Sequence, residues 1–143
     1  MTLENLVGST LHREQATDEE IDRLREKAAI RLDDAQNEQI SRESRFDLAY
    51  EALLQFGLAA LRANHYRPSS SGGHHMTVLQ TLPKTIGFPK EKVRLIDQFR
   101  RQRALGLYDG SFDPTAAELN ELIDTAKELQ KYLNNWLESQ PRT

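Results

Sequence analysis

The chain has 143 residues, of which 38% are hydrophobic and 29% are charged, and its formal net charge is -3. A chain of this length is most simply one domain, and its composition is too apolar for a disordered protein. Because the sequence contains no cysteine, disulfides, thiolate metal sites and cysteine nucleophiles are excluded.

The charge is unevenly distributed along the chain. From Lys84 to Arg103 seven basic residues stand against two acidic ones, so this segment carries +5 and the remainder -8. This split disfavours a DNA binder that uses its whole surface, and it leaves room for one patch that faces phosphate or an acidic partner. The sequence has no 18-residue apolar run and no signal-peptide pattern at its N-terminus, so we expect a cytoplasmic protein without membrane contact.

The first predicted helix begins at a capping box. Residues 1–16 show no sustained period and are predicted to form a flexible N-terminal arm, followed by a single helical domain over residues 17–140. Thr17 and Glu20 can satisfy each other's backbone amides, which starts a helix that runs to about Asn37. Its apolar residues recur at spacings of three or four: Ile21, Leu24, Ala28, Leu32 and Ala35.

The second helix is predicted to be the central one. It opens at Ser41 or Ser44 and ends before Pro68, and apolar residues cover nearly all of its faces between Phe46 and Leu61. Residues 69–73 then have the composition of a flexible linker.

Three further helices follow. A short apolar helix begins at His74 and is closed by Pro83, and a fourth helix begins after Pro89 and stops at Asp109 and Gly110, with Gly106 weakening it. The last helix is expected to begin with Asp113 as its N-cap and Pro114 at its first position, and it keeps a 3.6-residue period over more than twenty residues. Tyr132 and Trp136 on this helix are predicted to be core residues.

No stretch alternates with a period of two, so the sequence predicts no strand. The predicted fold is all-α: an up-and-down antiparallel bundle of four main helices plus one short helix.

Motifs for common cofactors are absent. The sequence has no phosphate loop, no Gly-rich dinucleotide fingerprint and no His-Glu-x2-His zinc pattern, so we expect no cofactor. His74 and His75 are adjacent and project in different directions, which makes a metal site improbable. His75 fits a capping or packing role, although the near-neutral pKa of an imidazole would also suit acid-base chemistry.

The fourth helix carries three arginines within four residues, Arg100, Arg101 and Arg103, and then Tyr108. A guanidinium has a fixed charge and a planar fork of donors that suits phosphate, so the cluster indicates an anionic partner. The alternative is that the arginines stabilise their own helix by opposing its macrodipole.

The run from about Ser44 to Gly110 resembles the HEPN superfamily (higher eukaryotes and prokaryotes nucleotide-binding) over about two-thirds of the chain. The resemblance rests on the helix that contains residues 46–50, the helix start at residues 73–75 and the segment 101–108. It implies a small antiparallel helical bundle that is commonly dimeric. Active members of this superfamily are metal-independent ribonucleases of toxin-antitoxin, CRISPR-linked and other defence systems. Their motif is an Arg, often followed by Asn, then a His after four to six residues, with a Tyr two residues beyond that His in one toxin group.

Carried over to this sequence, Arg101 matches the motif arginine, Gln102 stands at the Asn position, and Tyr108 matches the tyrosine. Gly106 falls where the histidine should be; an alternative register takes Arg103 as the arginine with Tyr108 at the histidine position. RNA cleavage needs groups that take and return a proton, which glycine cannot do and tyrosine, with a pKa near 10, does poorly. The resemblance therefore implies binding more strongly than cleavage.

Three hypotheses follow for the function. The first is a HEPN-like protein, linked to toxin-antitoxin or defence systems, that binds RNA, a nucleotide or a partner protein with little or no catalysis. The implied ligand-binding residues are Arg100, Arg101, Gln102, Arg103, Tyr108, His74 and His75. The second is an active metal-independent endoribonuclease toxin with Arg101 and Tyr108 as catalytic residues. The third is a structural interaction module whose arginines pair with acidic residues such as Glu118, Glu121 and Asp124. The expected partners are a second copy of the chain, RNA or a nucleotide, and a cognate antitoxin-type protein.

Overall fold

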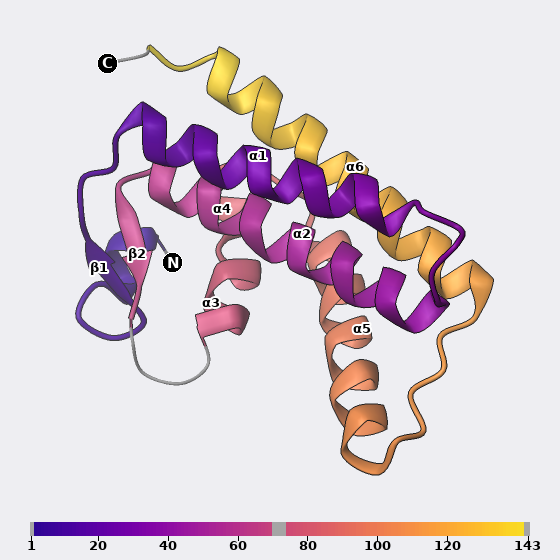
Figure 1. Cartoon of the computed structure of the whole chain (residues 1–143). Helices are drawn as coiled ribbons and strands as arrows, with labels where there is room; N and C mark the ends of the chain where they lie inside the picture. The colour runs from indigo at the N-terminus through magenta and orange to yellow at the C-terminus, as the bar shows by residue number, and fades with distance from the viewer. Residues whose placement is uncertain (1, 70–73, 142–143) are drawn as a thin grey trace.

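The computed structural model describes residues 2–69 and 74–141, except for the side chain of His74. The elements follow one another as η1 (Leu3–Leu6), β1 (Leu11–Arg13), α1 (Asp18–Ala35), α2 (Arg42–Ala63), β2 (Tyr66–Pro68), α3 (His74–Gln80), α4 (Leu82–Thr85), α5 (Lys90–Asp109) and α6 (Ala116–Glu138). The four long helices pack as a bundle, which confirms the predicted all-α fold (Figure 1). In the described part of the chain, no helix is both long and apolar enough to cross a membrane.

Three of the four long helices, α1, α2 and α6, begin at side-chain caps. The hydroxyl of Thr17 accepts from the amide of Glu20 at 3.1 Å, as the capping-box pattern predicts. The start of α6 differs from the prediction, because Thr115 and not Asp113 is the N-cap. The Thr115 hydroxyl accepts from the Glu118 amide, and the Glu118 carboxylate accepts from the Thr115 amide, so two amides at the helix start are satisfied reciprocally.

Helix α2 is the centre of the core. Its fully buried side chains include Phe46, Leu53 and Phe56, and its most extensive packing is against α1 and α6. Small residues let neighbours approach closely: a Cβ added at Gly57 would lie 2.7 Å from a methyl carbon of Val78 in α3. The short apolar segment that was predicted as one helix forms two, α3 and α4, which pack against α2.

A small two-stranded hairpin pairs the segment before α1 with the segment after α2. Strands β1 and β2 pair antiparallel, with Leu11 opposite Pro68 and Arg13 opposite Tyr66, and Leu11 is fully buried. The prediction of no strand is wrong here, because three-residue strands are too short to show a period of two. Residues 2–16, which the sequence suggests are a flexible arm, therefore include ordered elements that pack on the domain.

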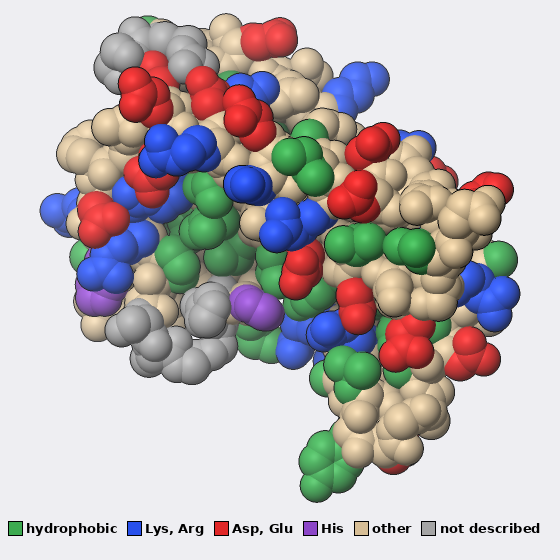
Figure 2. All heavy atoms as spheres, viewed as in Figure 1, with side chains coloured by type: hydrophobic (Ala, Val, Ile, Leu, Met, Phe, Trp, Pro, Cys, Tyr) green, Lys and Arg blue, Asp and Glu red, His purple; other side chains and the backbone are tan. Residues whose placement is uncertain are grey.

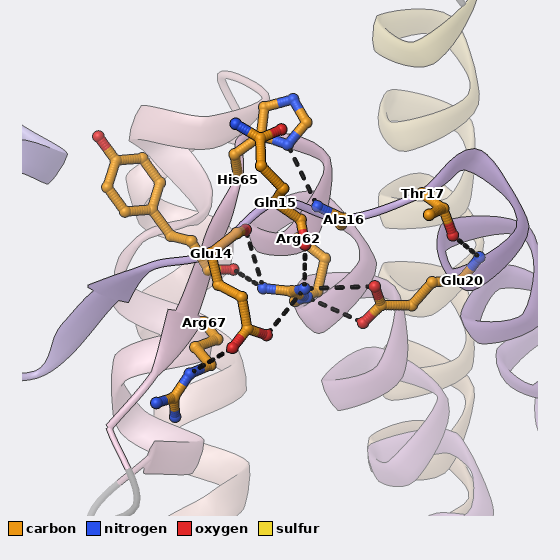
Figure 3. Close-up of polar contacts among 9 residues, drawn as sticks. Glu14, Gln15, Ala16, Thr17, Glu20, Arg62, His65 and Arg67 are labelled. Carbon is orange, nitrogen blue, oxygen red and sulfur yellow. Dashed lines mark hydrogen bonds and ion pairs between the residues drawn. The ribbon is translucent and has the colours of Figure 1, made fainter. Parts of the chain in front are cut away.

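The hairpin is held to the helices by Arg62, a buried residue near the end of α2 (Figure 3). Its Nε and Nη2 atoms donate to the two carboxylate oxygens of Glu20 at 3.0 and 3.2 Å. The guanidinium also donates to the backbone carbonyls of Glu14, Gln15 and Tyr66, at 3.1 to 3.3 Å, and forms an ion pair with the Glu14 carboxylate. Arg62 thus joins the segment before α1, α1 itself and β2 to α2.

Replacing Arg62 by alanine should lower the free energy of unfolding by about 2–4 kcal/mol, because three backbone carbonyls lose their charged donor. Urea denaturation measures this loss. Arg31→Ala is the matched control: it removes a surface ion pair with Glu51 and should cost less than about 1 kcal/mol. Equal losses in the two variants would contradict the anchoring role of Arg62.

Candidate functional site

The arginines of α5 pair mainly with acidic residues inside the domain. Arg100 donates from Nε to Asp97 at 2.9 Å, and Arg101 Nη2 lies 2.7 Å from the other oxygen of the same carboxylate. Asp97 balances only one of the two guanidinium charges, so this group of three residues keeps a net charge of +1. The third hypothesis expected pairs with Glu118, Glu121 and Asp124, whereas the structure shows Asp97 and Asp47 as the partners.

Arg103 faces the opposite side of α5 from Arg101. Two residues along a helix turn it by about 200°, which directs Arg103 toward α2. There its Nε atom donates to Asp47, and its guanidinium lies 5.6 Å from the centre of the Tyr50 ring. Arg103 therefore anchors α5 to α2, and Arg101, Arg103 and Tyr108 do not meet in one cleft of a single chain.

Tyr50 is a buried tyrosine at the junction of α2, α3 and α5. Its ring lies edge-on to the ring of His75, with 6.4 Å between the centroids. Within the described part of the chain, its buried hydroxyl has no hydrogen-bond partner. Burial raises the pKa of Tyr50, while the charges of Arg100 and Arg103 act in the opposite direction. The hydroxyl consequently remains protonated in the physiological range.

The three other predicted ligand residues are Gln102, His74 and His75. Gln102 donates to the Glu118 carboxylate at 2.8 Å, and so joins α5 to the start of α6. The Thr115 amide, and then Gln102, hold the pKa of Glu118 below its usual value. The side chain of His74 lies outside the described residues, and His75 contacts the ring of Tyr50 as described above.

One face of α5 is exposed to solvent at most of its positions, and only Asp97 within it is partly buried. Its residues recur at spacings of three or four, which places them on one side of the helix. We call this the outer face of α5; it consists of Lys90, Arg94, Asp97, Arg101, Leu105 and Tyr108. Tyr108 is 96% exposed, and Arg101 keeps 64% of its side-chain surface exposed. Arg101 and Tyr108, matched by the resemblance, thus share one accessible surface.

The last turns of α5, residues 104–109, project beyond the rest of the bundle (Figure 1). We call them the free end of α5. Leu105 and Leu107 are 74% and 45% exposed, and Figure 2 shows hydrophobic side chains at the tip of this projection. The free end thus presents apolar side chains to solvent.

A groove lies between α3 and the first half of α5, with a volume of about 260 Å³. Its lining residues are Met76, Leu79, Gln80, Lys90, Val93, Arg94 and Asp97. Asp97 also binds the arginines, so the groove and the outer face are continuous. Sequence reasoning missed Lys90 and Arg94 as site residues, because they are spaced along the helix and do not form a run.

Gly106 is required by packing. It is buried under Phe112, and a Cβ added there would lie 2.6 Å from Phe112 Cβ and 2.7 Å from its Cα. The Phe112 amide also donates to the Gly106 carbonyl at 3.2 Å. The returning chain therefore occupies the space that a motif histidine would need, and α5 continues through Gly106 to Asp109.

A second groove lies on α6, with a volume of about 650 Å³ and Tyr132 and Trp136 in its lining. Tyr132 was predicted to be core; it packs edge-on against Phe88 at 5.2 Å but stays 38% exposed. Of the residues that the structure describes, no three His, Asp or Glu side chains gather in a way that could hold a metal ion.

In comparisons with known proteins, no family model, no curated protein and no solved structure matches this chain.

Replacing Gly106 by alanine should destabilise the protein by about 1–3 kcal/mol, because the new methyl group overlaps the backbone of Phe112. Intrinsic helix propensity acts in the opposite direction, favouring alanine by about 1 kcal/mol. Thermal unfolding followed by circular dichroism shows which of the two effects is larger. A rise in melting temperature would show that Phe112 gives way easily and that position 106 can accept a side chain.

Proposed function

We propose that this protein is a HEPN-like helical protein that binds single-stranded RNA, or a nucleotide, on the outer face of α5 without efficient cleavage. The observation that carries the proposal is the sharing of one exposed helix face by Lys90, Arg94 and Arg101 and by the almost fully exposed ring of Tyr108. With a rise of about 1.5 Å per residue, this face extends over roughly 27 Å.

The chemistry of the face suits a single strand. Proteins that bind single-stranded nucleic acid combine cations that follow the backbone with aromatic rings on which bases stack. Arg101 and its neighbours supply the first element and Tyr108 the second. Arg101 shares the carboxylate of Asp97 with Arg100. If a phosphate binds the Arg101 guanidinium instead, Asp97 keeps its ion pair with Arg100.

The same geometry disfavours catalysis. The outer face carries no histidine, and the position where the resemblance places one has no space for a side chain. Arginine can still hold phosphate and stabilise charge, which supports binding. The resemblance places such a binder in a toxin-antitoxin or other defence system, with an antitoxin-type protein as a partner.

Binding is tested by fluorescence anisotropy with an end-labelled single-stranded RNA at several salt concentrations. Tyr108→Ala should raise Kd about 5- to 100-fold through the loss of base stacking. Arg101→Ala should weaken binding and reduce the slope of log K against log salt by about 0.7, since one phosphate contact is lost.

Arg31→Ala, on α1, is the control and should leave Kd unchanged within about twofold. The proposal is wrong if the wild-type protein does not bind RNA at low salt, or if both α5 variants bind as tightly as the wild type.

We also propose that the protein forms a homodimer through Leu107, on the side of the free end of α5 that points away from Leu105. Leu107 leaves apolar surface exposed where α5 projects from the bundle. A second copy presents the same leucine, so a two-fold arrangement lets the two Leu107 side chains cover each other and leaves the outer face of α5 open.

Light scattering after size-exclusion chromatography should give twice the chain mass of 16.4 kDa for the wild type and the single-chain mass for Leu107→Asp. Ile30→Asp is the matched control, because Ile30 is also exposed (54%) but lies on α1, and this variant should remain dimeric. A monomeric wild type at high concentration, or a dimeric Leu107→Asp variant, would contradict the assignment of the interface.

A further inference from the structure

The groove between α3 and α5 has an apolar floor. Leu79 is buried, Val93 is partly buried, and Met76, which is 37% exposed, lies at the edge of the groove. The carboxamide of Gln80 adds one acceptor and two donors at the rim. A planar ring can lie on such a floor, and a methionine sulfur makes favourable contacts with aromatic systems.

The charges around the groove are unequal at its two ends. Helix α5 carries six cations, and four of them have carboxylate partners: Lys92 pairs with Glu128, Arg100 and Arg101 with Asp97, and Arg103 with Asp47. Lys90 and Arg94 have no ion-pair partner among residues 2–69 and 74–141, and both line the groove. An anionic group therefore fits the end formed by Lys90 and Arg94, because at the other end Arg100 and Arg101 already share the carboxylate of Asp97.

The volume restricts the ligand further. About 260 Å³ is slightly below the range of about 300–1,000 Å³ typical of small-molecule sites, which suits one ring and its substituents better than a peptide helix. The site thus combines a flat apolar floor, an amide at the rim and two cations that have no carboxylate partner among the residues described.

We propose that this groove holds one nucleotide, with its base on Met76, Leu79 and Val93, the base edge at Gln80, and its phosphate at Lys90 and Arg94. The inference rests on the proposed function, because the groove is continuous through Asp97 with the outer face of α5. An RNA strand places one base in the groove, and the next nucleotides follow the helix past Arg101 toward Tyr108.

The test titrates the wild-type protein with each of the four nucleoside 5'-monophosphates by isothermal calorimetry. The four matching nucleosides, ribose 5-phosphate and inorganic phosphate are the comparison ligands. At least one monophosphate should bind, and the matching nucleoside, ribose 5-phosphate and inorganic phosphate should each bind at least tenfold more weakly. If no monophosphate binds, or if inorganic phosphate binds as well as the best one, the proposal is overturned.

Variants locate the site. The double variant Lys90→Ala/Arg94→Ala should weaken monophosphate binding at least tenfold, and Gln80→Ala should change the order of preference among the four bases. Lys90, Arg94 and Gln80 are exposed, so these variants should keep the wild-type melting temperature. Arg31→Ala, on α1, is the control because it removes a surface cation away from the groove, and it should leave monophosphate affinity within twofold; a loss as large as in the double variant would place the ligand elsewhere.

The two proposals fail in different ways. If the RNA affinity falls in Arg101→Ala and Tyr108→Ala but no monophosphate binds, the result supports RNA binding on the outer face and shows that the groove is not a nucleotide site. The opposite result is that monophosphate binding depends on Lys90 and Arg94 while RNA affinity is unchanged in Arg101→Ala and Tyr108→Ala. That result would support the nucleotide site in the groove and contradict RNA binding on the outer face.

Discussion

The burial of α2 is the constraint on which the rest of the structure depends. Its side chains are apolar on most of its faces, so it can be stable only when neighbours cover it on several sides. Helices α1 and α6 cover it most extensively, and α3 and α4 also pack on it. The edge-on contacts of Phe46 with Phe99 and Phe112 bring α5 and the chain that follows it onto the same helix.

The same helix orients the candidate site. Asp47 and Tyr50 lie one turn apart on α2 and together receive Arg103, which fixes the rotation of α5 about its own axis. With Arg103 turned inward, Arg101 and Tyr108 are turned outward by helix geometry. Gly106 adds a second restraint, because Phe112 can close over α5 only where the helix has no side chain.

Counting basic residues overstates the charge that a ligand can use. Arg100, Arg101 and Arg103 form the densest basic run in the sequence, yet all three have acidic partners in the folded chain. Lys90 and Arg94 are less conspicuous in the sequence, but they border a groove and have no carboxylate partner among the described residues. In the folded chain, the cations of α5 that no carboxylate of the described residues balances therefore lie in its first half.

The predictable parts of the structure are the local ones. Thr17 and Glu20 mark the start of α1 because capping acts over three residues, and the apolar period marks the long helices. The pairing of Arg103 with Asp47 could not be predicted from the sequence, because the two residues are 56 positions apart and meet only through packing. Gly106 looked like a lost catalytic residue, and its packing role depends on the path of the chain after α5. The hairpin was missed because its strands have three residues each.

The central claim is that the ligand surface is the outer face of α5 with the adjoining groove. A titration of ¹⁵N-labelled protein with a short single-stranded RNA, followed by amide chemical shifts, tests it most directly. The account predicts that the largest shifts occur in α5 at Arg94, Arg101 and Tyr108 and in α3 at Gln80. Shifts concentrated on α6 around Tyr132 and Trp136, with α5 unaffected, would contradict it.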